Sequence, residues 1–335
     1  MNLHKPIASL SLDLDNKWSY LKTHGDRGWE EFPSYLDKLV PRVLDFLSER
    51  NLQITFFVIG QDAALEKNLD ALRAISERGH EIGNHSFSHE PWMHLYDGDR
   101  VEHEIRATEE QIEKITGQRT VGFRGPGFSF SAATLTVLER RHYLYDASTF
   151  PTYLGPLARL YYFLHSNLAG EDRKQRRALF GSFSNGFRPL KPYRWHGKDG
   201  LLEIPVTTMP MLRLPIHLSY LLFLSGFSEA LALEYFRAAL GLCRLTGVSP
   251  SLLLHSLDFL GEEDKVGLDF FPGLKLRTNR KLKFVGQVLR VYSEQFQVLD
   301  MKGHARCIME VPSSKTLRYS PADPSPAPEA SYYDD

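Results

Sequence analysis

Short apolar runs alternate with amphipathic stretches along the first half of the chain. Apolar residues fill most of positions 7–14 and 52–59, which is typical of buried strands, whereas residues 35–50 repeat Leu and Val at helical spacing. The alternation continues as far as residue 146, with helices predicted at 64–78, 99–116 and 132–141 and strands at 80–85, 120–124 and 143–146. Repeated alternation of strand and helix favours a parallel sheet with helical crossovers.

In the second half of the chain, the alternation of strands and helices stops and then resumes. Residues from about 150 to 195 fit neither period and include the charged run EDRKQRR at 171–177, so we interpret the region of about 150–200 as an insertion. Further on, strands are predicted at 201–206, 251–255 and 297–301, and helices at 228–246 and 277–294. A tail rich in Pro, Ser, Ala and Asp follows at 312–335, and this composition is typical of disorder.

Seven or eight strands, each followed by a helix or a loop, predict an α/β fold, a distorted (β/α) barrel that spans residues 1–311. The insertion is expected to lie over the active-site end of this barrel. In such barrels the active site lies where the parallel strands end at their carboxyl side. Residues with useful chemistry should therefore occur directly after the predicted strands.

Composition narrows the class of protein without assigning a function. The 335 residues carry 40 Lys and Arg against 41 Asp and Glu, and the formal charge of −1 gives no basic surface for nucleic acid. No run approaches the ~18 apolar residues of a membrane-spanning helix, and the N-terminus lacks the apolar segment of a secretory signal. We therefore expect a cytoplasmic protein, with the inner face of the membrane as a second location.

Two aspartates end the first predicted strand, in the sequence Ser-Leu-Asp-Leu-Asp at 11–15. Because successive strand side chains point to opposite faces, Asp13 and Asp15 share one face. Two neighbouring carboxylates repel each other unless their roles differ, and a cation held by one of them is a common solution. By itself, the pair also fits a solvated strand end before a loop.

Two histidines follow the strand predicted at 80–85, in the sequence His-Ser-Phe-Ser-His. A helical turn after the strand would let His85 and His89 converge on one ion, and neutral imidazole is a good ligand for zinc. With one carboxylate they would form a facial triad that leaves coordination positions for water and substrate. The spacing alone also occurs by chance.

Two further strands end in candidate groups. Arg124 opens the sequence Arg-Gly-Pro-Gly-Phe, where it can pair with a carboxylate and where the Gly-Pro-Gly bend can turn backbone N–H groups toward an oxyanion. His255 closes the apolar strand at 251–255 and is a candidate general acid. Taken singly, these features also fit a tight turn with a surface arginine and a histidine of the core.

The order of these four clusters, D-x-D, H-S-x-x-H, R-x-P and L-x-H, resembles the polysaccharide deacetylases (NodB-homology proteins, carbohydrate esterase family 4) over residues 7–260. The D-x-D form, together with YDASTFP at 145–151 and LEIPV at 202–206, is similar to the branch that contains cytoplasmic and membrane-associated deacetylases and deformylases. The resemblance implies a hydrolase of linear amides that uses one divalent transition metal, with Zn²⁺ as the expected ion.

The resemblance also implies a role for each candidate residue. Asp15, His85 and His89 would hold the metal ion. Asp13 would be the general base that takes a proton from the attacking water. Arg124 would orient Asp13 and help to keep its carboxylate ionised.

Other residues would act on the far side of the scissile amide. His255 would protonate the leaving amine, and the backbone N–H of Phe128, at a position where the family often has Tyr, would stabilise the oxyanion. Asp146 is a candidate partner for His255, although an aspartate that caps the turn after its strand fits equally well. Trp18 follows Asp15 closely enough to line the pocket and stack on a sugar ring.

The expected substrate is an N-acetylated amino sugar in a polysaccharide, a glycolipid or a lipid-linked glycan. Two apolar stretches, 153–164 and 209–227, are interpreted either as core or lid segments or as contacts with a lipid-linked sugar or the membrane interface. Two other hypotheses stay open: a deformylase or small-molecule amidohydrolase that uses the same site, and an inactive relative that binds carbohydrate. The inactive relative is disfavoured because a binding module needs neither Asp13 nor His255.

Overall fold

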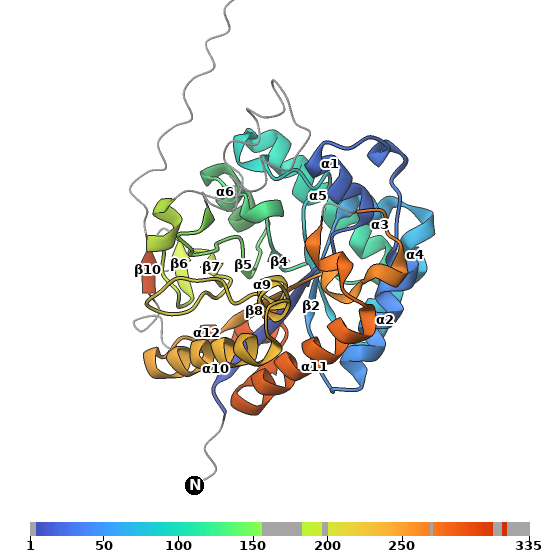
Figure 1. Ribbon diagram of the computed structural model, residues 1–335. Coiled ribbons are helices and arrows are strands. Elements are labelled where there is room, and N and C mark those ends of the chain that lie inside the picture. Colours follow the sequence, from blue (N-terminus) through green and yellow to red (C-terminus); the bar gives the residue numbers. More distant parts are fainter. Residues whose placement is uncertain (1–4, 156–182, 196–199, 269–270, 311–316, 320–335) are drawn as a thin grey trace, which may run out of the picture.

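The structure, a computed structural model of the 335-residue chain, describes residues 5–155, 183–195, 200–268, 271–310 and 317–319. Its centre is a curled sheet with helices on the outside (Figure 1). Seven strands run parallel in the order β7-β5-β4-β3-β2-β1-β8, which confirms the predicted α/β fold with a distorted barrel. These strands are β1 (Ile7–Asp13), β2 (Thr55–Val58), β3 (Glu81–Asn84), β4 (Gly122–Phe123), β5 (Tyr145–Asp146), β7 (Leu202–Glu203) and β8 (Ser251–His255).

The curled sheet closes on itself through the segment that follows β7. Thr207 donates its backbone N–H to the carbonyl of Ser251 at 3.0 Å, and the backbone N–H of Ser251 donates to Thr207 Oγ1 at 2.8 Å. Within the described residues, no strand pairs with β8 on the side away from β1. The barrel is therefore joined by few hydrogen bonds along this side, which we call the seam.

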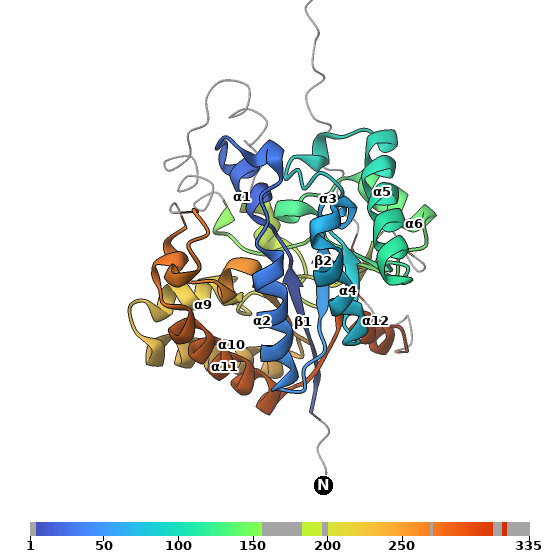
Figure 2. The same ribbon diagram turned by 90° about the vertical axis from the view of Figure 1, so that its right-hand side faces the viewer.

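Helices cover the outer face of the sheet, and α2 and α4 lie beside β1 and β2 (Figure 2). Their ends follow local sequence signals. The Asp97 side chain accepts the backbone N–H of Arg100 at 2.8 Å where α5 begins, and α5 ends at Gly117 with φ 67°. The helices are α1 (Lys17–His24), α2 (Leu36–Ser48), α3 (Gly60–Ala64), α4 (Leu69–Glu77), α5 (Gly98–Thr116), α6 (Ala132–Arg140), α9 (Leu218–Ser225), α10 (Glu229–Thr246), α11 (Thr278–Gln295) and α12 (Met301–Glu310).

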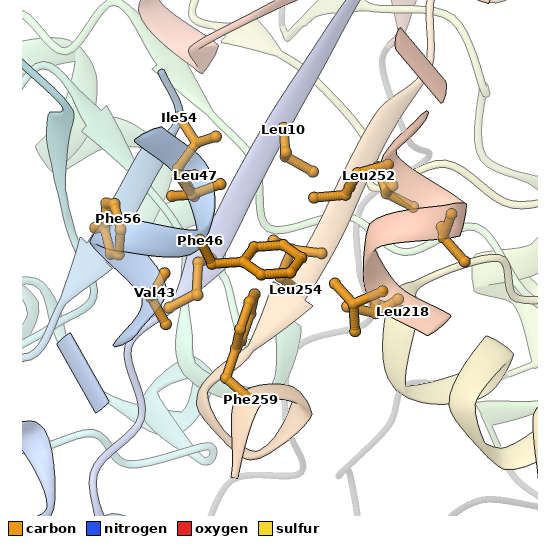
Figure 3. Packing of buried hydrophobic residues seen from close by; sticks show 14 of the residues in the cluster. Leu10, Val43, Phe46, Leu47, Ile54, Phe56, Leu218, Leu252, Leu254 and Phe259 are labelled. Atoms are coloured by element: carbon orange, nitrogen blue, oxygen red, sulfur yellow. The ribbon is translucent and has the colours of Figure 1, made fainter. Parts of the chain in front are cut away.

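The largest hydrophobic cluster lies between the strands and the helices that cover them. Leu10 of β1 and Leu252 and Leu254 of β8 point toward side chains of α2 and α9, including Phe46 and Leu218 (Figure 3). These leucines alternate with residues that face the barrel interior, as the period-two pattern of β1 predicts. Burial of this apolar surface, at about 25 cal/mol per Å², holds β1 and β8 together although they come from opposite ends of the chain.

The amino ends of the strands are closed by α12, at the end of the barrel opposite the predicted active site. The backbone N–H of Met301 donates to Thr55 Oγ1 at 2.7 Å, and that of Lys302 donates to Glu81 Oε2 at 2.8 Å. His304 Nδ1 lies 2.8 Å from Ser9 Oγ. The first turn of α12 is thus bound to side chains of β1, β2 and β3.

Several short elements were not predicted from the sequence. They include α1, α3, α12 and two strands, β6 (Tyr193–Trp195) and β10 (Leu317–Tyr319). Strand β6 lies within the predicted insertion and pairs with β7 in antiparallel orientation, and β10 lies within the predicted disordered tail and pairs with β6. Such three-residue strands carry no readable period, because pairing with a neighbour fixes them.

The rest of the insertion and of the tail, including 156–182 and 320–335, lies outside the described residues. In the described part of the chain, no helix combines the length and the apolar character needed to cross a membrane. The apolar stretch 209–227 instead forms a bend followed by α9, which agrees with a core or lid helix.

Candidate active site

Three potential metal ligands meet at the carboxyl ends of β1 and β3. Asp15 follows β1, and His85 and His89 follow β3; all three side chains are buried, and their ligand atoms lie within 4.8 Å of one another. Asp15 Oδ1 lies 2.9 Å from His89 Nε2 and 3.4 Å from His85 Nε2. The structure therefore brings together the three residues predicted to hold a metal.

The hydrogen bonds around this cluster suit a cation at its centre. His85 Nδ1 lies 2.6 Å from the carbonyl oxygen of Arg124, and a carbonyl can only accept, so Nδ1 carries the proton. In the neutral ring, the lone pair of His85 Nε2 then faces Asp15, whose Oδ1 is buried and has no hydrogen-bond partner among the described residues. Two opposed lone pairs need a positive charge between them, and one carboxylate with two imidazoles is a donor set that fits a divalent transition metal.

The charges of the cluster favour the ionised carboxylate. Burial by itself raises the pKa of Asp15, but the interactions of its carboxylate with the imidazoles of His89 and His85 outweigh burial and lower this pKa well below its usual range. Burial lowers the pKa of His85, whereas the neighbouring Asp13 and Asp15 carboxylates raise it, with a net upward shift. The Tyr35 hydroxyl also donates to the Asp15 carbonyl at 2.6 Å, which fixes the backbone there.

The segment between the two histidines is a loop and not the predicted helical turn. Ser86 and His89 both take positive φ angles, 60° and 49°. Glu104 of α5 holds this loop, because its carboxylate accepts the backbone N–H groups of Phe87 and Ser88 at 2.9 and 2.8 Å and the Ser88 hydroxyl at 2.7 Å. These bonds stabilise left-handed backbone that non-glycine residues rarely adopt, and it is this geometry that turns His89 back toward Asp15.

A buried ion pair lies next to the cluster. Arg124 is fully buried, and its Nη1 donates to Asp13 Oδ1 at 2.6 Å and to Ser11 Oγ at 2.9 Å. Its Nε donates to the carbonyl of Ala147 at 3.1 Å, and the guanidinium lies over the Phe57 ring at 4.3 Å. The predicted pairing of Arg124 with Asp13 is thus present, and the guanidinium fixes the orientation of the Asp13 carboxylate.

His255 lies beside Asp13 in the sheet. The two residues are register partners in the parallel strands β1 and β8, so their side chains project on the same face. The imidazole Nδ1 lies 2.9 Å from Ser219 Oγ, at the start of α9. A general base and a general acid could thus act from neighbouring strands.

Asp146 does not hold His255 in this structure. It is fully buried and accepts a hydrogen bond from Ser148 Oγ at 2.5 Å, and Ser148 Oγ in turn accepts the backbone N–H of Gly125 at 2.8 Å. Burial raises the pKa of Asp146, and burial together with the charge of Asp146 raises that of its sheet partner Glu203. Asp146 supports the turn after Arg124 through Ser148, and this is closer to the alternative of an aspartate that binds a turn.

The turn after Arg124 has a different donor pattern from the one expected. A Cβ atom at Gly125 would lie 1.8 Å from the Ser129 carbonyl oxygen, so the tight approach needs glycine at this position. The backbone N–H of Phe128 donates to the Gly125 carbonyl at 3.0 Å. It is therefore already used within the turn and is not free for an oxyanion.

Trp18 does not line an open pocket. Its side chain is 1% exposed, and its Nε1 donates to Asp62 Oδ1 at 2.9 Å. Asn16 Nδ2 donates to the same oxygen at 2.7 Å, and burial raises the pKa of Asp62 to about 7. Trp18 is thus a structural residue under the loop that carries Asp15, and we no longer interpret it as a residue that stacks on sugar.

Aromatic side chains form a row from the Gly-Pro-Gly turn to the end of β8. Phe128 stacks on Phe150 at 4.9 Å, Phe150 meets His217 at 5.7 Å, and His217 meets His255 at 5.8 Å, measured between ring centroids. The His217 ring is held neutral, because burial and the nearby His255 lower its pKa to about 3. The row connects residues that follow β4 and β5 with β8, on the side of the seam.

Several residues that support the site were not found from the sequence. Glu104, Ser219 and Tyr35 act on partners 16, 36 and 20 positions away, so no short motif contains them. Asp258 is different, because it lies three positions after His255 and accepts the backbone N–H of that residue at 2.8 Å. An Asp at this spacing is a known local capping signal and could have been recognised.

The chain is similar to known proteins over a part that contains some of these site residues. Residues 26–145 match the model of the family described as polysaccharide deacetylase, a range that includes His85, His89 and Arg124. The peptidoglycan-N-acetylmuramic acid deacetylase of Bacillus subtilis (strain 168) is 34% identical over 110 residues, which cover 32% of this chain and 41% of the relative. The peptidoglycan-N-acetylglucosamine deacetylase of Bacillus cereus is 34% identical over 89 residues, 27% of this chain and 31% of the relative.

The matched region is only a part of these proteins. The chain covers between 31% and 41% of the length of the first four curated relatives, two of which are uncharacterised. A similar solved structure is that of a Mycobacterium smegmatis protein provisionally assigned as a polysaccharide deacetylase, with a TM-score of 0.58 and 21% identity. It covers 94% of this chain and 98% of its own, so the likeness in fold extends well beyond residues 26–145.

Proposed function

Because the chain belongs to the polysaccharide deacetylase family, we propose that it is a metal-dependent hydrolase that removes an N-acetyl group from an amino sugar. The observation that carries this proposal is the meeting of three buried metal-ligand candidates with an arginine-held carboxylate. A binding module would gain nothing from burying that ion pair beside them, since burying charges is costly. The arrangement therefore favours catalysis over binding alone.

Asp15, His85 and His89 would hold the ion through one oxygen and two nitrogen atoms. When bound, a divalent transition metal, for which Zn²⁺ is the first choice, supplies a Lewis acid that polarises the amide carbonyl and makes water more acidic. The three side chains leave coordination positions for ligands other than protein. The protonated Nδ1 of His85, bound to the Arg124 carbonyl, keeps Nε2 free to act as a ligand.

Asp13 is the proposed general base. One of its oxygens is held by Arg124, so the carboxylate cannot rotate away from the water that it deprotonates. Arg124 also offsets the negative charge that would otherwise repel Asp15. The new bond joins the water oxygen to the carbonyl carbon, and the proton passes to Asp13.

His255 is the proposed general acid, which protonates the amine nitrogen as the carbon–nitrogen bond breaks. For the oxyanion we propose the backbone N–H of Gly127 in place of that of Phe128. Gly127 lies in the same turn with φ 58°, and its N–H has no hydrogen bond among the described residues. A positioned donor of this kind contributes about 3–4 kcal/mol to transition-state stabilisation.

The proposed substrate is an N-acetylated sugar of a glycan, since two of the similar proteins are peptidoglycan N-acetyl-sugar deacetylases. A lipid-linked glycan at the inner face of the membrane is a more specific form of the same proposal. It is supported by exposed apolar side chains on and next to α9, the helix that carries Ser219. Met211, Phe223 and Phe227 are 70%, 57% and 78% exposed.

The first test is metal content together with acyl release. We expect the purified chain to bind about one divalent metal, and His85→Ala and Asp15→Ala to lose it, as measured by elemental analysis. The metal-loaded protein should release acetate from N-acetylated chito-oligosaccharides, peptidoglycan fragments or a lipid-linked N-acetyl sugar. Release of formate from N-formyl sugars instead would assign the deformylase alternative.

His103→Ala is the matched control, since this histidine is exposed on α5 and away from the cluster. It should bind as much metal as the wild type. If the wild type binds neither zinc nor cobalt after incubation, the proposed chemistry is wrong and the chain would be an inactive relative.

A further inference from the structure

The imidazole of His255 has a hydroxyl as its partner where a carboxylate would be expected. A histidine that acts as a general acid starts as an imidazolium, and a negatively charged group at its second nitrogen normally orients and stabilises that ring. Here Nδ1 meets Ser219 Oγ at 2.9 Å, whereas Asp146 accepts its hydrogen bond from Ser148 and is the register partner of Glu203. The negative charge that His255 needs must therefore come from elsewhere.

Asp258 is a carboxylate near His255 that has no other role in the proposed mechanism. It is 2% exposed, and its Oδ2 accepts the backbone N–H of His255 at 2.8 Å. The Ser219 side chain is close enough to Asp258 for hydrogen bonding from it to be among the effects that lower the pKa of this carboxyl group. Burial raises the pKa of Asp258, while the charge of His255 is the largest effect that lowers it. Ser219 is thus in contact with both the imidazole and a buried carboxylate.

We propose that Asp258 and Ser219 form a relay that positions the proposed general acid, His255. The Ser219 hydroxyl donates to Asp258, which leaves Ser219 Oγ to accept the N–H of His255 Nδ1. Both are positioning residues, because neither has to touch the substrate. The inference rests on the proposed function of His255.

This direction of hydrogen bonding determines which nitrogen does the chemistry. With Nδ1–H bound to Ser219, Nε2 is the atom that carries the transferable proton. When that proton moves to the amine nitrogen and the carbon–nitrogen bond breaks, the ring returns to its neutral Nδ1–H form with no other proton displaced. The Asp258 carboxylate, acting through the hydroxyl, stabilises the imidazolium before the transfer.

Other charged and titratable groups surround the relay without replacing it. Asp13 faces His255 from β1, and His217 meets its ring from the start of α9. Burial raises the pKa of Tyr20 of α1, and the nearby charges of Asp258 and Asp13 add to this rise. From α11, Lys281 donates to the carbonyls of Leu257 and Leu260 and faces Asp258 with its positive charge.

The Lys281 ammonium provides a counter-charge for the relay. It is 1% exposed, and burial lowers its pKa to about 8, partly offset by the charge of Asp258. Its two carbonyl acceptors lie in the short turn that carries Asp258. Lys281 therefore fixes that turn and makes an ionised Asp258 tolerable in a buried position.

The relay is tested first by the tautomer of His255, which is read without any catalysis. In protein labelled with ¹⁵N-histidine, nitrogen shifts distinguish the two tautomers, and His255→Gln identifies the signal by its loss. We expect the Nδ1–H form in the wild type. Ser219→Ala should shift the ring toward the Nε2–H form that predominates in water, and Ser219→Thr, which keeps the hydroxyl, should restore Nδ1–H.

The second readout is the dependence on the leaving group. Ser219→Ala should lower kcat on an N-acetyl sugar about 10- to 100-fold with little change in KM, since general acid catalysis contributes roughly 10²–10⁴-fold. The loss on 4-nitrophenyl acetate should be at least about tenfold smaller, because this leaving group needs no proton. Asp258→Asn, which keeps the shape and removes the charge, should also lose more on the amide than on the ester.

Ser225→Ala is the matched control, because this serine lies on the same helix and its hydroxyl bonds only the Leu222 carbonyl. It should behave as the wild type in both readouts. An unchanged tautomer in Ser219→Ala, or equal losses on amide and ester, would overturn the relay. A wild type without activity would overturn the proposed function, whereas the tautomer readout would still decide the relay.

Discussion

At the scale of single residues, Arg124 contacts several parts of the candidate site, and its sequence motif does not reveal these contacts. Its side chain bonds Ser11 and Asp13 of β1 and the carbonyl of Ala147, and its own carbonyl accepts the His85 Nδ1 proton. One residue therefore sets the orientation of the proposed base and the tautomer of a proposed metal ligand. A guanidinium can serve three acceptors in a plane, which an ammonium on a flexible stem cannot.

The conservative change Arg124→Lys should therefore be costly. We expect the free energy of unfolding to fall by about 2–4 kcal/mol, because charge-assisted hydrogen bonds are lost in a buried position. Deacetylation should fall by roughly 10²-fold as Asp13 moves out of place. Urea denaturation and steady-state kinetics measure the two effects.

Arg78→Lys is the control, since Arg78 pairs with Asp45 at 2.8 Å on the surface, where both side chains are largely exposed. Its unfolding free energy should stay within about 0.5 kcal/mol of the wild type. Equal effects of the two changes would mean that the buried pair adds nothing beyond a surface one.

At the scale of elements, long periodic segments were predictable and contacts between elements were not. Helix α5 was predicted within one residue of its bounds, because its apolar spacing is regular and Gly117 marks its end. The three-residue strands β6 and β10 were not predicted, because pairing with a neighbouring strand forms them and they are too short to show a period in the sequence. Composition also misled at β10, where Leu and Tyr within a polar tail form a strand beside β6.

The candidate site divides in the same way. The sequence indicated that Asp13, Asp15, Arg124 and His255 lie at strand ends, and parallel strands bring their carboxyl ends to one edge, whereas the roles of these residues stay predictions. The residues that support the site lie on helices, and the sequence does not show where these helices pack relative to the site. Glu104 reaches the loop at 85–89 from α5, and the sequence does not reveal this contact, so the spacing of the two histidines suggested a helical turn in place of the observed loop.

One glycine at the end of a helix and one inside a helix should respond in opposite directions to alanine. Gly117, at the end of α5, has φ 67° and open space around it. Gly117→Ala should therefore lower the free energy of unfolding by about 1 kcal/mol, and backbone strain is the only cause. Gly241, inside α10, is also in open space but helical, so Gly241→Ala should stabilise by about 0.5–1 kcal/mol. Urea denaturation of the single variants checks the signs, and a shared sign would refute the assignment of Gly117 as a left-handed cap.

At the scale of the whole molecule, a buried carboxyl group joins four elements at the closed end of the barrel. Glu81 accepts hydrogen bonds from Thr55 of β2, Tyr145 of β5 and the backbone of Lys302 in α12. Burial raises the pKa of Glu81 to about 7, although the Thr55 hydroxyl lowers it in part. The folded state therefore prefers the protonated form of this group.

Folding stability should depend on pH through Glu81. The stabilisation is fully present below the unfolded pKa of 4.5 and is lost as the pH rises through about 7. About 3 kcal/mol is expected for this difference in pKa. Glu81→Gln should remove this part, so that its stability relative to the wild type rises by about 2–3 kcal/mol between pH 5 and pH 8.

Denaturation at several pH values measures this slope. Glu77→Gln, at an exposed position on α4, is the control and should show no such change relative to the wild type. Parallel pH curves for Glu81→Gln and the wild type would show that Glu81 ionises in the folded protein as it does in water.

The position of β1 has a consequence for the order in which the chain is made. β1 pairs with β2, which follows within the first 60 residues, and with β8, whose end is linked to it by a bond from Ser256 to Asp13 across 243 positions. A chain emerging from the ribosome thus presents Asp15, His85 and His89 early and His255 late. The proposed metal ligands are therefore synthesised well before the proposed general acid, whose strand β8 completes the sheet beside β1.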